Sequence, residues 1–441
     1  MADAASPLTQ TVVMKFGGTS VADADRIKRA AERVVAAQEA GNRVVAVLSA
    51  RGKTTDELVS MAYEVSPRPD PREMDMLLST GERISCALAA MVINDLGHQA
   101  ESLSGSQAGI VTDTSHTKAR IIDVRAERIV RALDEGKIVL VAGFQGTSAF
   151  LKEEGGYEIH GNVTTLGRGG SDTTAVAIAA ALGADVCEIY TDVAGVFTSD
   201  PRIVPDARKL SQVSFEEMLE MSASGAGVLQ LRSVEYARNH GVRIHCRSSF
   251  DSGPGTFVLS EQETMERPLV TAVTHSTDEA RVTLTGIPDR PGVAGRVFTA
   301  LAGTNVNVVM IIQNEPETEG HGADMSFTVP RADLPSARDA LEPLIGDLGI
   351  SAIATDENMG KVSLVGAGMK SHPGVAAKTF AVLGDAGINI EMISTSPIKI
   401  SCVIREEDVP TAVRELHAAF ELGDDAVRPE DPRVTDRPVV T

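Results

Sequence analysis

The chain has 441 residues, enough for roughly two or three domains with sizeable cores. Its 41 Lys and Arg against 61 Asp and Glu give a formal charge of −20, which repels polyphosphate backbones, so we expect no nucleic-acid partner. A hydrophobic fraction of 43% excludes disorder for most of the chain. The four cysteines are scattered, and neither a signal-like N-terminus nor a run of about 20 apolar residues occurs, which predicts a reduced cytoplasmic protein that does not enter a membrane.

Short β-branched runs alternate with Ala-rich segments of helical period from residue 11 to residue 259. This alternation predicts one α/β domain, in which a mainly parallel sheet is sandwiched by helices. The strands are expected at residues 12–16, 43–49, 138–143, 186–191 and 243–246. The helices are expected at residues 24–40, 73–96, 126–135, 172–182, 215–222 and 233–240.

After a polar boundary at residues 248–267, the chain repeats itself with a period of about 80 residues. Aligning residues 281–311 with residues 361–393 matches Pro291-Gly292 with Pro373-Gly374, Phe298 with Phe380, and Asn307 with Asn389. Each unit reads as strand, loop, helix and strand, with a further strand at 324–329 or 398–404. Two units are too few for a solenoid, so we expect them to pack together and against a second copy of the chain.

The motif KFGGTS, residues 15–20, lies between an apolar strand and a long amphipathic helix. Glycines let backbone N–H groups approach phosphate oxygens, the helix N-terminus favours anions, and Lys15 adds a mobile positive charge. The spacing is neither that of a Walker A loop nor GxGxxG. The motif therefore predicts a phosphate cradle, with an ordinary strand-to-helix turn as the alternative.

A second glycine turn, TTLGRGGSD, leads into the helix that starts near residue 172. Arg168 can pair with a carboxylate, and Asp172 can cap the helix or accept from an ammonium group, an arrangement that suits an amino acid. An ordinary N-cap beside a solvated Arg is the alternative. Glu82, on a predicted helix, can serve a substrate amine or be plain surface charge.

A third motif, YTDVAGVFTSDPR, follows a strand at the end where open α/β sheets bind their ligands. Asp192, Asp200 and Arg202 can bracket a nucleotide and its Mg²⁺, although a DPR sequence is commonly just a turn. No GxSxG elbow and no Cys–His arrangement supports nucleophilic catalysis. We expect no protein-bound metal.

Together, KFGGTS, SARGKTTDEL, GERIS, VTTLGRGGSDTTA, EIYTDVAGVFTSDPR and the twin repeats resemble the aspartate kinases of the actinobacterial type. The resemblance implies an amino acid kinase fold at residues 11–259, βαβ-type ACT domains at 268–350 and 351–422, and a flexible tail at 423–441. It implies transfer of the γ-phosphoryl group of ATP, with Mg²⁺, to the β-carboxylate of L-aspartate. The product is 4-phospho-L-aspartate, at the first step of lysine, threonine and methionine biosynthesis. Because the nucleophile is already an anion, catalysis needs positioning and charge neutralisation rather than a base.

The resemblance also assigns roles to residues. The catalytic residues are Lys15 and Asp172, and Lys15 stabilises the transition state. The nucleotide is bound by Lys15, Phe16, Gly17, Gly18, Ser49, Thr191, Asp192, Phe197, Asp200 and Arg202. Aspartate is bound by Thr19, Ser20, Thr54, Thr55, Glu82, Arg168, Gly170, Ser171 and Asp172. On charge grounds, we expect Arg168 to bind the α-carboxylate and Glu82 or Asp172 to receive the ammonium group.

Threonine and/or lysine is expected to act as effector at the ACT pair, on Asp289, Gly292, Asn307, Gln313, Asn389, Ile390 and Glu391. Val309 and Val293 stand where relatives carry acidic residues, so feedback by lysine is doubtful. Gly227 stands where relatives carry Lys, which removes a positive charge near ATP. The chain is expected to form a homo-oligomer through its ACT domains, or an α2β2 assembly if a second chain starts at Met265.

Two other functions stay open at the level of sequence. One is a regulatory amino-acid-binding protein whose kinase half is weakened or inactive, a reading that Gly227 supports. The other is a kinase for a different small carboxylic acid, of the acetylglutamate type.

Overall fold

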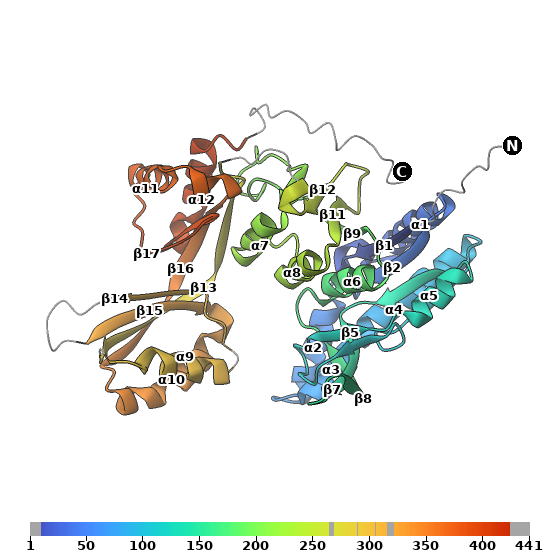
Figure 1. Ribbon diagram of the computed structural model, residues 1–441, viewed down its shortest axis with the longest axis horizontal. Coiled ribbons are helices and arrows are strands. Elements are labelled where there is room, and N and C mark those ends of the chain that lie inside the picture. Colours follow the sequence, from blue (N-terminus) through green and yellow to red (C-terminus); the bar gives the residue numbers. More distant parts are fainter. Residues whose placement is uncertain (1–9, 264–268, 289, 305, 315–321, 424–441) are drawn as a thin grey trace.

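The computed structural model describes residues 10–263, 269–288, 290–304, 306–314 and 322–423. It has an N-terminal half, from β1 to β12, and a C-terminal half, from β13 onward (Figure 1). After the resemblance noted above, they are called the kinase half and the regulatory half. Met265, Asp289 and the predicted tail beyond Gly423 lie outside the described residues. Gly423 itself forms a β-bridge with Ala207 of the kinase half.

An eight-stranded sheet forms the centre of the kinase half, and its neighbouring strands are parallel except for β11 and β12. The middle strands are continuous apolar runs because helices cover both of their faces. In spatial order the strands are β10 (Gln212–Ser214), β12 (Thr256–Leu259), β11 (Arg243–Ser248), β9 (Val186–Thr191), β1 (Thr11–Phe16), β2 (Arg43–Leu48), β6 (Ile138–Ala142) and β3 (Ala100–Leu103).

Two separate hydrophobic clusters flank this sheet, which confirms the predicted sandwich. Helices α1 (Ala24–Glu39) and α4 (Thr80–Asp95) pack on one face. The other face is covered by α5 (Glu127–Asp134), α6 (Gly170–Ala181), α7 (Phe215–Ala223) and α8 (Leu231–His240). All four cysteines are unpaired and buried.

The helix predicted at residues 73–96 is two helices, α3 (Pro71–Leu78) and α4, which are separated at Ser79. Together they span Pro71–Asp95, the one helical segment of the described residues that is long and apolar enough to cross a membrane. In the fold, α4 packs against β3, β6 and α1 and buries Glu82. This segment is therefore a core element of the kinase half.

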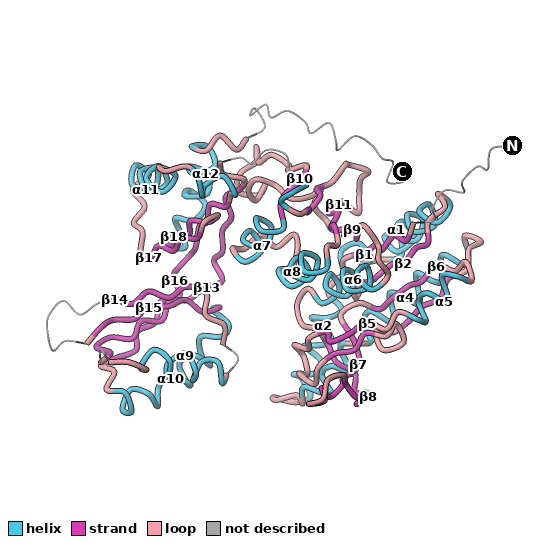
Figure 2. The backbone as a smooth tube through the Cα atoms, viewed as in Figure 1, coloured by secondary structure: helices cyan, strands magenta, loops and turns pink. Residues whose placement is uncertain are grey.

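The sequence patterns did not predict the short strands β3, β10 and β12 of the large sheet. They also did not predict one helix and a second, smaller sheet of the kinase half. The helix is α2 (Thr54–Val65), and the sheet has the order β5 (Ile121–Val124), β4 (Ile110–Thr112), β7 (Gln145–Leu151) and β8 (Tyr157–Thr165). These strands lie beside α2 and α3 at one end of the kinase half (Figure 2). They are short or largely exposed, so they show neither an apolar run nor a clean alternation.

The regulatory half is one antiparallel six-stranded sheet (Figure 2). Its order is β14 (Met310–Asn314), β15 (Ala323–Pro330), β13 (Ala272–Ile287), β16 (Ala352–Val365), β18 (Lys399–Arg405) and β17 (Met392–Ser396). Four helices belong to it: α9 (Val293–Gly303), α10 (Leu334–Leu348), α11 (Val375–Asp385) and α12 (Val409–Ala419). Short 3-10 helices occur at Gly18–Val21, Glu261–Glu263, Arg331–Asp333, Ala367–Ser371 and Glu406–Asp408.

The two units have the predicted internal symmetry, with one more helix each than the sequence indicated. Gly292 and Gly374 occupy equivalent positions immediately before α9 and α11, with φ of 92° and 106°. A side chain is strained at such angles, which explains the glycine in both copies. The additional helices, α10 and α12, follow the last strand of each pattern that the sequence predicted.

The two units exchange strand segments through β13 and β16. Val273, in the first half of β13, packs in the core of the second unit, whereas Leu284, in its second half, packs in the core of the first. Likewise Ile350 and Ile353 pack with the first unit, and Leu364 packs with the second. We therefore propose that the first unit spans about 278–357, and that the second combines 269–277 with 358–422. The boundary predicted from the sequence, between residues 350 and 351, would separate Ile353 from the core of the first unit, against which it packs.

Candidate functional site

The carboxyl ends of β1, β2 and β6 meet at one edge of the large sheet. Ser49 N–H donates to Phe16 O at 3.1 Å, and Gly143 N–H donates to Leu48 O at 3.1 Å, so the loops that follow the strands lie side by side. A Cβ on Gly18 would lie 2.9 Å from Ala50 O, closer than Cβ atoms approach in proteins. This glycine-lined edge is where open α/β sheets bind their ligands.

An ion pair between Lys15 and Asp172 stands at this edge. Lys15 is the fifth residue of β1 and 8% exposed, and Asp172 lies in the first turn of α6 and is 5% exposed. A Cβ on Gly17 would lie 3.5 Å from Lys15 Nζ, so glycine leaves room around the ammonium group. Asp172 does not cap its helix, since its side chain is turned to Lys15.

Glu82 is a second buried carboxylate at the same edge, and it forms no ion pair with the described residues. Its side chain is 3% exposed, Oε1 accepts from Ala50 N–H at 3.2 Å, and Oε2 has no hydrogen-bond partner among the described residues. Burial raises the pKa of Glu82 to about 7. A Cβ on the neighbouring Gly81 would lie 3.7 Å from Thr54 Cγ2, which places the start of α2 beside Glu82. The arrangement suits a ligand that brings a positive charge.

The predicted nucleotide residues fall into two groups. Phe16 stacks on Tyr190 with ring centroids 4.9 Å apart, and Thr191 donates to the exposed Asp192 at 3.2 Å, so these residues stay at the carboxyl edge. Phe197, further along the loop that follows β9, packs against the core of the second unit of the regulatory half.

Asp200 and Arg202 are paired with each other, and the Arg202 side chain is 89% exposed. Their side chains form an ion pair of 2.7 Å, and hydrogen bonds from Arg202 hold the pKa of Asp200 below its usual value. Of the predicted aspartate residues, Ser20 is turned to Ser249, with the hydroxyl oxygens 2.6 Å apart. Ser171 is buried, and a Cβ on Gly143 would lie 2.7 Å from its hydroxyl oxygen.

The predicted effector residues are dispersed over the regulatory half. Asn307, Gln313 and Asn389 are exposed, and Ile390 packs against the core of the second unit. Glu391 is already paired, with Arg281 at 2.9 Å and with Arg405 at 3.3 Å. An effector ammonium group at Glu391 must therefore compete with two guanidinium groups.

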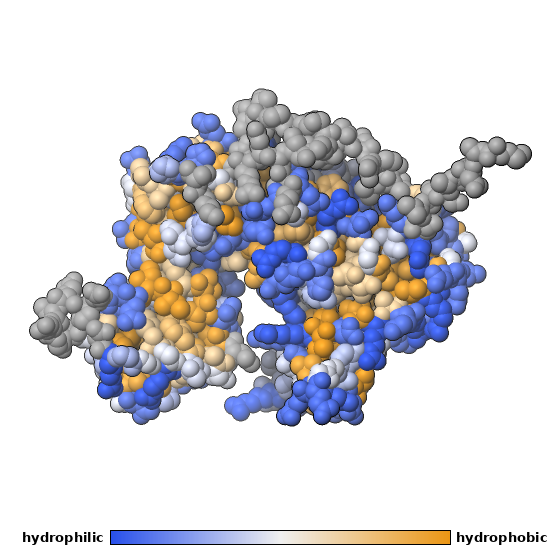
Figure 3. Space-filling model, viewed as in Figure 1, coloured by the Kyte–Doolittle hydropathy of each residue, from blue (hydrophilic) through white to orange (hydrophobic). Residues whose placement is uncertain are grey.

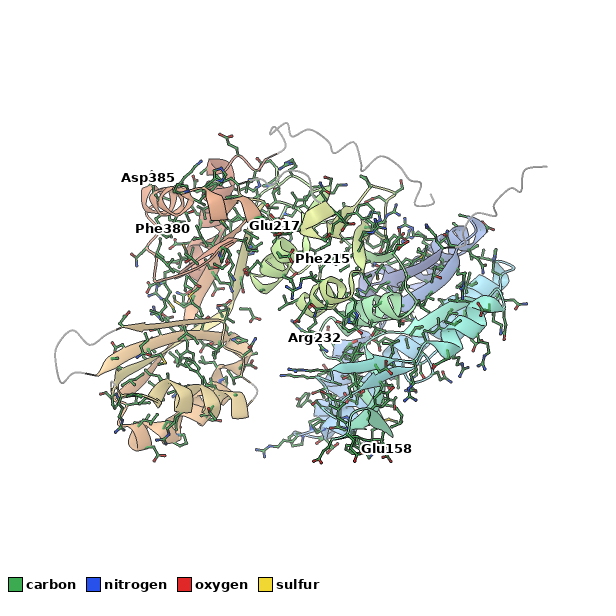
Figure 4. All side chains as sticks on the ribbon, viewed as in Figure 1. Glu158, Phe215, Glu217, Arg232, Phe380 and Asp385 are labelled. Carbon is green, nitrogen blue, oxygen red and sulfur yellow. The ribbon has the colours of Figure 1, made fainter. Side chains whose placement is uncertain are left out.

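The sequence analysis missed several buried polar residues, of which Glu217 joins the two halves. Glu217 is 5% exposed on α7, where it completes a capping box with Ser214. Its Oε1 accepts from the Thr271 hydroxyl at 2.7 Å and from Ala367 N–H at 3.0 Å, both in the regulatory half. Figure 4 shows Glu217 on the side of α7 that faces this half. The S-x-x-E capping pattern at residues 214–217 is visible in the sequence, but its distant partners are not.

Comparison with known proteins agrees with this geometry. Residues 10–248 match the amino acid kinase family, and residues 281–346 and 362–420 each match an ACT domain. The aspartokinase of Mycolicibacterium smegmatis is 56% identical over 416 residues, covering 94% of this chain and 97% of the relative. E. coli aspartokinase III in complex with aspartate and ADP (R-state) matches with a TM-score of 0.78 at 27% identity, covering 93% of this chain and 99% of that one. The complex of E. coli aspartokinase III with lysine and aspartate (T-state) matches with a TM-score of 0.69, at the same identity and coverage.

The fold and the matched domains define the class: the chain belongs to the amino acid kinase family, with two ACT domains after the kinase domain. Within this class it is a member of the aspartokinases, which are ATP-dependent kinases of lysine, threonine and methionine biosynthesis. The resemblance that the sequence motifs indicated is thereby confirmed, as is the predicted fold class.

Replacement of Lys15 tests the centre of the site. Lys15→Met removes the ammonium group while keeping most of the side-chain volume, so we expect kcat to fall about 100- to 1,000-fold. It also leaves Asp172 buried without its partner, so we expect a lower melting temperature as well. Steady-state kinetics and thermal melting measure the two effects. Lys28→Met, on the exposed surface of α1, is the matched control and should behave like the parent. Parent-like turnover of Lys15→Met would contradict the assignment.

The pKa of Glu82 gives a pH prediction. Because that pKa is about 7 in the free enzyme, kcat/KM for L-aspartate should rise with pH through about 7, as the carboxylate becomes able to accept an ammonium group. The rise should disappear in Glu82→Gln.

The raised pKa of Glu82 also makes the folded protein less stable at high pH, where the carboxylate is charged. The folded state holds the proton more tightly than the unfolded state, so Glu82 costs on the order of 3 kcal/mol above pH 7 and nothing below its unfolded pKa. Glu82→Gln should therefore melt at a higher temperature than the parent at pH 8, with the difference lost near pH 5. A melting difference that is equal at both pH values would show that Glu82 does not titrate as the structure indicates.

Proposed function

We propose that this aspartokinase transfers the γ-phosphoryl group of Mg-ATP to the β-carboxylate of L-aspartate. The observation that carries the proposal is the convergence of the Lys15–Asp172 pair and the unpaired Glu82 on one glycine-lined edge. Coupling ADP formation to NADH oxidation tests it, with turnover expected only when L-aspartate and ATP are both present.

Each side chain has one task in this proposal. Lys15 neutralises charge that develops on the transferred group, and Asp172 holds Lys15 in place. Because Asp172 is occupied by Lys15, we assign the substrate ammonium group to Glu82. The exposed Arg168 binds the α-carboxylate, which leaves the β-carboxylate free to attack.

We propose that Mg²⁺ enters with the nucleotide. The described residues contain no group of three or more His, Cys, Asp or Glu side chains placed to hold a metal ion. Phosphate oxygens and water are the ligands that Mg²⁺ prefers in kinases. The ion supplies positive charge on the phosphates, and Asp192, exposed at the end of β9, is the carboxylate we expect nearest to it.

Gly227 gives a test on the nucleotide side. It is exposed, its φ is compatible with any residue, and a Cβ there meets nothing within 4 Å. We expect Gly227→Lys to lower KM for Mg-ATP about tenfold, because a charge-assisted contact to phosphate is worth about 1.5 kcal/mol. Initial rates against ATP concentration measure it.

Gly346→Lys, at an exposed glycine of α10 with equally open surroundings, is the control and should leave KM unchanged. An unchanged KM in Gly227→Lys as well would place the phosphates away from this segment. It would also remove the main support for the alternative that Gly227 weakens or inactivates the kinase half.

For regulation, we propose threonine and/or lysine as effector at the ACT pair, with feedback weaker than in relatives. Val309 is 45% exposed, so an acidic residue there would face solvent or ligand. Val293 is 5% exposed and packs in the core of the first unit, where its apolar side chain contributes to packing rather than to binding. A bound amino acid inhibits only if it binds the less active conformation more tightly.

We also propose a homo-oligomer formed through the regulatory half. Among the described residues, the edge strands β14 and β17 pair on one side only, and Ile311 and Ile393 on them are 52% and 41% exposed. Figure 3 shows hydrophobic residues gathered on this half. Unpaired apolar edges are surfaces that a second copy can cover.

Light scattering tests this interface. Ile311→Arg places a charge on edge strand β14 and should convert the oligomer to a smaller species at micromolar concentration. Leu96→Arg, at a similarly exposed position of the kinase half, should leave the mass unchanged. A mass that does not change with Ile311→Arg would place the interface elsewhere.

A further inference from the structure

Asp75 is a fully buried carboxylate that none of the proposed steps uses. It lies on α3, and its oxygens accept from Thr117 N–H at 3.0 and 3.1 Å and from the Thr165 hydroxyl at 2.5 Å. His116 Nδ1 lies 2.6 Å from its second oxygen. Thr117 has a φ of +65°, a strained value for a residue with a side chain, which the contacts to Asp75 help to hold. Asp75 thereby fixes the 116–119 segment and the end of β8 to α3.

Arg232, on a different helix, binds the same two segments. It is the second residue of α8, and its Nη1 donates to Leu166 O at 2.5 Å while its Nη2 donates to Ala119 O at 3.0 Å. Figure 4 shows Arg232 on the side of α8 that faces α2 and β5. A planar guanidinium reaches two carbonyl groups at once in a way that a lysine ammonium group on a flexible stem does not.

The loop held between these two anchors is Leu166–Gly169, with Arg168 near its end. Leu166 N–H donates to Phe144 O at 2.9 Å, and a Cβ on Gly169 would lie 2.1 Å from Cγ of Gln230, the residue that precedes α8. The backbone is therefore enclosed. The side chain of Arg168 is exposed, and it makes no hydrogen bond or ion pair with the described residues. The position of the Arg168 backbone therefore determines where its guanidinium group can reach.

We propose that Asp75 and Arg232 are positioning residues for substrate binding: they clamp the Leu166–Gly169 loop from two helices and so fix Arg168 where it meets the α-carboxylate of aspartate. This inference rests on the role given to Arg168 in the proposed function. Neither residue touches the substrate, and each acts on Arg168 through backbone carbonyl or hydroxyl groups. Because the loop is already fixed, less conformational entropy is lost when aspartate binds. The clamp therefore affects the binding of aspartate but not that of ATP.

Arg232→Lys tests the clamp, because it keeps the charge and loses the contact with two carbonyls. We expect KM for L-aspartate to rise about tenfold, while kcat and KM for ATP stay within about twofold. Arg238→Lys, on the same helix and exposed, is the matched control and should match the parent. A change in kcat and both KM values together would indicate general damage and overturn the inference.

The Thr165 hydroxyl gives a second, milder test that keeps the fold. Thr165→Val removes only the donor to Asp75, whereas Thr165→Ser retains it. We expect KM for aspartate to rise in Thr165→Val and to return to the parent value in Thr165→Ser. Equal values in the two variants would contradict the role of Asp75.

Arg168→Ala separates failure of this inference from failure of the proposed function. If Arg168→Ala leaves KM for aspartate unchanged, the role of Arg168 itself is wrong. If it raises KM but Arg232→Lys and Thr165→Val do not, only the clamp is wrong. When Arg168 and the clamp both have the proposed roles, the double variant Arg168→Ala/Arg232→Lys should have a KM for aspartate no higher than that of Arg168→Ala alone. Additive effects of the two substitutions on this KM would overturn the proposal.

Discussion

The buried ion pair of Lys15 and Asp172 is the contact on which the site depends. Either charge alone would be costly to hold at such low exposure, so each requires the other. The pair joins β1, at the centre of the sheet, to the first turn of α6, and the glycines at 17, 18 and 143 let the surrounding loops close on it. Glu82, buried nearby without a cation, leaves the site one positive charge short. In the function we propose, the amino acid substrate brings that charge, together with a carboxylate for Arg168.

The loop that follows β9 links this edge to the regulatory half. It starts at the exposed Asp192, and Phe197 then packs against the second ACT unit. The Thr198 hydroxyl lies 2.9 Å from His417 Nε2 and donates to Leu422 O at 3.1 Å, while Glu217 ties α7 to Thr271 and Ala367. A shift of the second unit must therefore move the loop or break buried hydrogen bonds. If an amino acid binds the regulatory half as we propose, such contacts would couple it to the loop that follows β9.

Much of the fold could be predicted from the sequence because the signals are local. Apolar runs gave β1, β2, β6 and β9, and the glycine motifs gave the edge where Lys15 and Asp172 meet. The strand exchange through β13 and β16 could not be predicted, because each of these continuous strands contributes residues to the cores of both units. Asp75 was missed because Thr117 and Thr165 are 42 and 90 residues away in the chain. Phe197 packs against the core of the second unit, a contact that its contiguous motif does not show.

Hydroxamate formation from Mg-ATP and two acceptors, L-aspartate and N-acetyl-L-aspartate, tests the central claim most directly. The two acceptors share the β-carboxylate and the α-carboxylate, and differ in the ammonium group that Glu82 is assigned to bind. The account predicts turnover with L-aspartate and a loss of most kcat/KM with the acetylated compound. Equal turnover with both, or turnover with the acetylated compound alone, would contradict it.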